Sequence, residues 1–138
     1  MSLPLKPYTL VFDERPQYLY AQVRCDTISP EIASDYLNDI LNECRELRYE
    51  RLMIERDIPV RLSTAKLPML ASEFAKMGLE GLKIAFVDKR INNLSLMRLV
   101  AGTTRRLGIN VRVYRNRPEA RRWLLYGDMD TEPGSLDA

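Results

Sequence analysis

The segment covering residues 82–126 constrains the fold more than any other part of the chain. It contains two short runs rich in branched and aromatic residues, 84–87 and 111–114, and a helical pattern follows each. The first helical pattern ends at Gly108, and the second begins at Asn116 with a proline and an acid in its first turn. Strand, helix, strand, helix in this order predicts parallel strands joined by helical crossovers.

The upstream half of the chain extends the same alternation. Residues 8–12 and 18–23 predict two strands that pair as a hairpin, and residues 51–56 predict a third strand. A helix begins after Ser29, where a hydroxyl cap precedes a proline, and residues 67–77 are helical. The order ββαβαβαβα predicts a single α/β domain with a mainly parallel five-stranded sheet, an N-terminal β-hairpin and four helices.

Length and composition agree with one globular domain. The chain has 138 residues, of which 46% are hydrophobic, enough to bury a core without metals or disulfides. We assign the domain to residues 8–126, with a loose leader at 1–7 and a polar, acidic, flexible tail at 127–138. We find no secretory signal and no apolar run long enough to span a bilayer, so we expect a cytoplasmic protein.

The absence of histidine argues against an enzyme. It removes the commonest general acid or base, and it rules out Ser-His and Cys-His nucleophile pairs and His-bearing zinc sites. Cys25 and Cys44 lack metal or redox spacing, and the glycine-rich phosphate-binding motifs are absent. We therefore predict no catalytic residue, no metal and no cofactor.

The positive charge is concentrated in the second half of the chain. Residues 83–126 carry 11 basic and 2 acidic side chains, whereas residues 1–82 carry 10 basic and 13 acidic ones. We expect the last two helices to be neighbours, so that their arginines either bind an anion or are paired and solvated. No aromatic-interleaved platform accompanies the arginines, so nucleic acid is not an expected partner. The arginines of these helices are Arg98, Arg105, Arg106, Arg121 and Arg122.

Asp88 is a candidate ligand-binding residue at the end of a central strand. Open α/β sheets bind ligands at the carboxyl ends of their strands, and Arg61 and Lys89 are expected nearby. A carboxylate without a partner acid or base does not make a catalytic site. We expect Asn92 or Asn93 to cap the helix that follows.

Ser63 and Thr64 lie at or just before the start of a predicted helix. They can serve as a simple helix cap, or they can be phosphorylated or receive an anion there. Arg61 and Lys66 are close enough in sequence to neutralise a phosphate. Both interpretations stay open.

The element order resembles the STAS domain of anti-sigma factor antagonists, within the broader SpoIIAA-like superfamily. The resemblance covers residues 8–125 and is most specific in the stretches FVDK, TTRRLG and RPEARRWL. It implies a non-catalytic regulatory module of bacterial signalling that contacts a protein partner, here through residues 61–68. Such antagonists carry Asp-Ser-Ser-Gly with a phosphorylated serine, but residues 63–66 of this chain read Ser-Thr-Ala-Lys. The usual phosphoserine motif is therefore not preserved.

The alternative function is binding of a small anionic ligand or a lipid headgroup by an arginine-rich face. The distribution of charge favours such a ligand. The sequence leaves a homodimer open and does not identify the partner.

Overall fold

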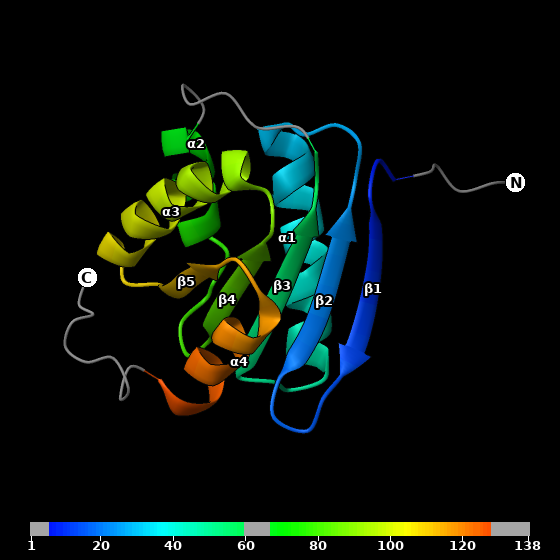
Figure 1. Cartoon of the computed structure of the whole chain (residues 1–138), viewed down its shortest axis with the longest axis vertical. Coiled ribbons are helices and arrows are strands. Elements are labelled where there is room, and N and C mark those ends of the chain that lie inside the picture. Colours follow the sequence, from blue (N-terminus) through cyan, green and yellow to red (C-terminus); the bar gives the residue numbers. More distant parts are fainter. Residues whose placement is uncertain (1–5, 60–66, 128–138) are drawn as a thin grey trace, which may run out of the picture.

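The computed structural model describes residues 6–59 and 67–127, and it has the predicted order of elements (Figure 1). The elements are β1 (Thr9–Glu14), β2 (Leu19–Arg24), α1 (Pro30–Glu46), β3 (Arg51–Asp57), α2 (Leu67–Ala75), β4 (Lys83–Asp88), α3 (Ile91–Arg106), β5 (Asn110–Tyr114) and α4 (Arg117–Tyr126). The α/β class, the mainly parallel sheet and the ββαβαβαβα order are confirmed.

The five strands lie in the sheet in the order in which they occur in the chain. β1 pairs antiparallel with β2, and all other neighbours are parallel. The first strand is longer than predicted, because Glu14 still pairs with Leu19. A hydrogen bond of 3.1 Å from the Arg15 N–H to the Tyr18 carbonyl closes the turn between β1 and β2.

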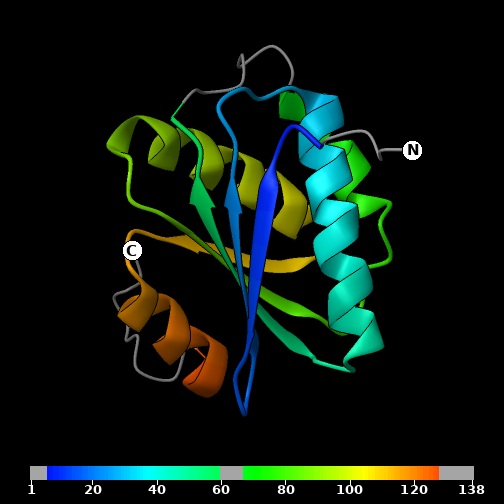
Figure 2. The ribbon, with the colours of Figure 1, turned by 90° about the vertical axis from the view of Figure 1, so that its right-hand side faces the viewer.

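Helices α1, α2 and α3 cover one face of the sheet, and α4 covers part of the other (Figure 2). Crossovers between parallel strands are right-handed, and here each leads to the next strand along the sheet, so their three helices share a face. Side chains alternate along β3 accordingly: Ile54 lies in the large core under α1–α3, and Met53 lies in a smaller core with Trp123 of α4.

This arrangement contradicts the expectation that the last two helices are neighbours. Arg98, Arg105 and Arg106 belong to α3, whereas Arg121 and Arg122 belong to α4 on the opposite face. The prediction was wrong because α4 follows the last strand and makes no crossover, so the handedness rule does not apply to it.

The helix caps expected at Ser29 and at Asn116 are present. The Ser29 hydroxyl accepts from the Ile32 N–H at 3.1 Å, and the Asn116 side chain accepts from the Glu119 N–H at 2.9 Å. The prediction that Asn92 or Asn93 caps α3 was wrong, because that helix already begins at Ile91.

The start of α3 is held by a residue outside the helix. Arg90 occupies the cap position without a side-chain cap bond, and its N–H donates to Asp88 Oδ1 at 3.0 Å. The aspartate at the end of β4 thus orients the chain as it enters α3. Among the described helices, none is both long enough and apolar enough to cross a bilayer.

We predict that Trp123→Ala lowers the free energy of unfolding by about 3–5 kcal/mol. The Trp123 side chain is buried in the smaller core, and Lys83 Nζ lies 4.7 Å from its ring centroid and donates to its carbonyl at 2.6 Å. Urea unfolding measures the change. Tyr126→Ala is the matched control on the same helix: its side chain is exposed, so the change should stay within about 0.5 kcal/mol. Equal effects would contradict the assigned packing of α4.

Candidate functional site

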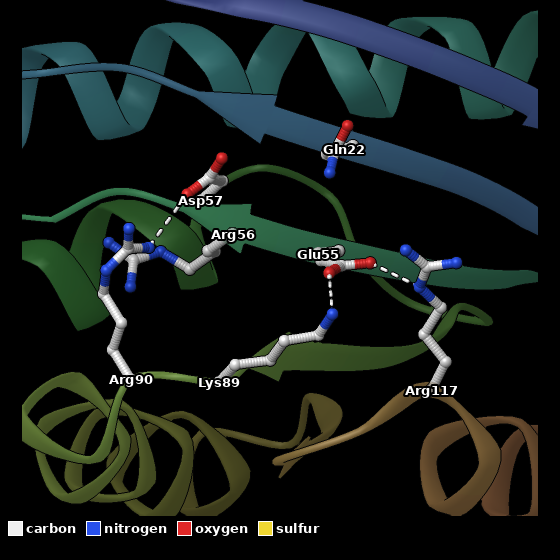
Figure 3. Close-up of a pocket in the computed structure, with 7 residues that line it drawn as sticks. All are labelled: Gln22, Glu55, Arg56, Asp57, Lys89, Arg90 and Arg117. Atoms are coloured by element: carbon white, nitrogen blue, oxygen red, sulfur yellow. Dashed lines mark hydrogen bonds and ion pairs between the residues drawn. The ribbon is translucent and has the colours of Figure 1, made fainter.

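A polar cavity of about 400 Å³ lies at the carboxyl ends of β2 and β3, beside the start of α4 (Figure 3). It lies where open α/β sheets commonly bind ligands. The lining side chains come from β2, β3, the residues after β4 and the start of α4: Gln22, Glu55, Arg56, Asp57, Lys89, Arg90 and Arg117.

The Glu55 carboxylate lies on the floor of the cavity and holds two elements together. It is 5% exposed, and its Oε1 accepts hydrogen bonds from Tyr20 Oη and Arg117 Nε, each 2.6 Å long. Lys89 Nζ lies farther away, 3.5 Å from Oε2. Burial alone would raise the pKa of Glu55, but the bonds from Tyr20 and Arg117 and the nearby cations bring it below its usual value. Glu55 is therefore ionised at neutral pH.

The Asp57 carboxylate bridges two arginines at the carboxyl ends of the strands. Its Oδ2 accepts from Arg24 Nε at 2.8 Å, and its Oδ1 accepts from a terminal nitrogen of Arg90 at 2.9 Å. Hydrogen bonds from Arg90 and Arg24 lower the pKa of Asp57. Asp57 therefore links β2, β3 and the segment that enters α3.

Arg56 and Asp88 form a buried ion pair next to the cavity. A terminal nitrogen of Arg56 lies 2.7 Å from Asp88 Oδ2, and the two side chains are 8% and 0% exposed. Arg56 Nε also donates to Tyr36 Oη at 3.2 Å. Burial alone would lower the pKa of Arg56, but Tyr36 and Asp88 raise it. Both Asp88 oxygens accept hydrogen bonds, the second from the Arg90 N–H.

Three cations line the outer part of the cavity. The side chains of Lys89, Arg117 and Arg90 are 65%, 50% and 42% exposed. Figure 3 shows Lys89 extending toward Glu55 between Arg90 and Arg117. Arg117 also lies over the Tyr20 ring, 5.2 Å from its centroid, which fixes the direction of its guanidinium group.

The structure brings only some of the sequence-predicted site residues to this cavity. Asp88 lies directly behind it as the partner of Arg56. The arginines of α3 and α4 that the sequence predicted as an anion site do not line it: Arg98, Arg105, Arg106, Arg121 and Arg122. The predicted site residues of the partner surface lie outside the described residues: Arg61, Ser63, Thr64 and Lys66.

Several lining residues were missed in the sequence, above all Gln22, Glu55 and Asp57. One signal was available: the apolar strand β3 ends in the charged triplet Glu55-Arg56-Asp57, which is unusual in a strand between two parallel neighbours. No local pattern connects Glu55 with Arg117, because they are 62 residues apart.

The chemistry of the cavity favours binding. Glu55 and Asp57 are each held ionised by at least one arginine, so neither side chain carries a proton to donate at neutral pH. Within residues 6–59 and 67–127, no group of three acidic or sulfur side chains is arranged to hold a metal ion. Among the cations that line the cavity, Lys89 and Arg117 have the most exposed side chains and are the groups available to a ligand.

We predict that the free energy of unfolding decreases as the pH falls from about 5 to about 3. The folded-state pKa values of Glu55 and Asp57 lie below the ordinary values of 4.5 and 3.8. Their stabilisation is therefore present above the ordinary pKa and is lost as the pH falls through the folded-state pKa. Urea unfolding at several pH values measures this. Glu55→Gln should flatten the dependence, and Glu80→Gln, an exposed control, should follow the native curve. A native slope in Glu55→Gln would contradict the assignment.

Comparison with models of known protein families gives no match, and comparison with curated proteins gives none either. The resemblance to STAS domains therefore stays a prediction from element order and local sequence.

Proposed function

We propose that the chain is a non-catalytic binding module whose sheet-edge cavity receives an anionic group of a small ligand. The observation that carries the proposal is the convergence of Lys89, Arg90 and Arg117 on one cavity. These cations come from two segments, the one after β4 and the start of α4, so the fold has to be complete before they meet.

The charge balance around the cavity supports an anionic ligand. Three carboxylates, Glu55, Asp57 and Asp88, are surrounded by five cationic side chains, which leaves two positive charges in excess. The cations are Arg24, Arg56, Lys89, Arg90 and Arg117. Arginine and lysine placed in this way bind carboxylate or phosphate through charge-assisted hydrogen bonds. The anion site proposed here replaces the arginine-rich helix face expected from the sequence.

We predict that inorganic phosphate binds in this cavity at low ionic strength, with a dissociation constant on the order of 1 mM. Backbone amide shifts in an NMR titration, with sodium chloride added to keep the ionic strength constant, report where it binds. The shifts should be largest around Lys89, Arg90 and Arg117. The double variant Lys89→Gln/Arg117→Gln should weaken binding about tenfold or more, because it removes two cations of the site.

The matched control is Arg121→Gln/Arg122→Gln, which removes two cations from exposed positions of α4. It should leave phosphate binding unchanged. Loss of binding in this control, with binding retained in the cavity variant, would place the anion site on the helix surface and overturn the proposal. Absence of any shift in the cavity residues would also overturn it.

A second candidate function is the regulatory, protein-binding role that the STAS-like order implies. It is supported by the observed order ββαβαβαβα. In this proposal the chain acts in the cytoplasm of a bacterium and contacts a regulatory protein through residues 61–68.

The test of this second function is affinity purification of partners with native protein and with the double variant Ser63→Asp/Thr64→Asp. We predict that the variant changes the set of co-purified proteins, because two added carboxylates alter the charge of the predicted partner surface. The cavity variant Lys89→Gln/Arg117→Gln serves as the control and should retain the native set. An identical set for native protein and the aspartate variant would contradict the regulatory role.

A further inference from the structure

The cavity also indicates what kind of anion it takes, an inference that rests on the proposed function. We infer that its ligand is a hydroxylated phosphate monoester, such as a sugar phosphate, and not a bare anion or a fatty acid. Three features of the cavity carry the inference: the size of its charge excess, the ionised acids that line it and its volume.

The charge excess matches a phosphate monoester. Two positive charges remain after the three carboxylates at the site are balanced. A phosphate monoester carries about −1.5 to −2 charge at neutral pH. A polyphosphate would carry more negative charge than the two excess positive charges, and a single carboxylate would leave one of them uncompensated.

The two acids that line the cavity determine where the phosphate lies. Glu55 and Asp57 are ionised, so they repel an anion placed against them. The phosphate must therefore lie toward the outer cations. Lys89 is suited to this position because its ammonium is 3.5 Å from Glu55, a looser pair than the 2.6 Å bond of Arg117. Arg117 binds Glu55 through Nε, and Figure 3 draws this bond to Nε and not to a terminal nitrogen.

The same acids require hydrogen-bond donors on the rest of the ligand. A carboxylate accepts hydrogen bonds at several lone-pair positions and donates none when ionised. Hydroxyl groups facing Glu55 and Asp57 can donate to them, whereas an alkyl chain would bury polar groups without partners. Gln22, on β2 across the cavity, offers both a donor and an acceptor to such hydroxyls.

The volume leaves room for more than the phosphate. A cavity of about 400 Å³ is within the range of small-molecule sites, roughly 300–1,000 Å³. All seven of its lining side chains are charged or carry an amide. This composition suits a compact polyol and not an apolar body.

The experiment compares glucose 6-phosphate, inorganic phosphate and glucose by NMR titration of the full chain at constant ionic strength. Glucose 6-phosphate should bind about tenfold or more tightly than inorganic phosphate, equivalent to about 1.4 kcal/mol or more. Glucose alone should bind weakly or not at all. Equal affinities for the two phosphates would overturn this inference and leave the proposed function intact. Absence of binding by both would overturn both proposals.

Variants of the two acids separate the role of the hydroxyls from that of the phosphate. Glu55→Gln and Asp57→Asn keep the shape of the side chains but remove the ionised acceptors. They should bind inorganic phosphate at least as tightly as the native chain, because a repelling charge is lost. The ratio of the affinity for glucose 6-phosphate to the affinity for inorganic phosphate should be smaller than in the native chain. An unchanged ratio of these two affinities in both variants would overturn the inference. Circular dichroism and urea unfolding confirm that each variant is folded.

The phosphate monoester can be a soluble metabolite or a lipid headgroup, and a vesicle measurement distinguishes the two sources. Vesicles that contain phosphatidylinositol 4-phosphate present a phosphate monoester on a hydroxylated ring at a membrane surface. Sedimentation of the chain with these vesicles, lost in Lys89→Gln/Arg117→Gln, would assign a headgroup. Binding of glucose 6-phosphate without sedimentation would assign a soluble ligand. If the chain sediments with the vesicles but does not bind glucose 6-phosphate, and Lys89→Gln/Arg117→Gln sediments equally, the inference for this cavity is contradicted.

Discussion

The neutralisation of three carboxylates at one edge of the sheet is the constraint on which the rest of the structure depends. The register of β3 and β4 places Arg56 beside Asp88, and the two side chains form a buried ion pair between the strands. Removing one partner of such a pair destabilises a protein by about 3–5 kcal/mol. Because Tyr36 of α1, Arg90 before α3 and Arg117 of α4 all bond this cluster, it links helices on both faces of the sheet.

The order of the elements could be predicted from the sequence because local signals determine it. Ser29 and Asn116 each cap the helix that directly follows them in the chain, and both caps are present in the structure. The apolar strand β4 likewise predicts burial on both faces, and all of its residues after Lys83 are buried. Signals of this kind act over a few residues, so a single sequence is enough to read them.

The candidate site could not be predicted to the same extent, because it depends on contacts between distant segments. Arg117 meets Glu55 only because α4 folds onto the face opposite α1–α3, and no local signal selects that face. The failed cap at Asn92 or Asn93 has a similar cause. Asp88 bonds the Arg90 N–H and starts α3 earlier, which requires the aspartate to be held at the end of a buried strand.

The separation of the two cores has a consequence for how such a protein can diversify. The large core under α1–α3 maintains the sheet, whereas α4 has its own small core and supplies one wall of the cavity. Substitutions at the start of α4 can therefore alter the lining of the cavity without disturbing the packing that determines the fold. A lineage could change the shape and charge of the cavity by changing this last helix alone, while the other face of the sheet stays constant.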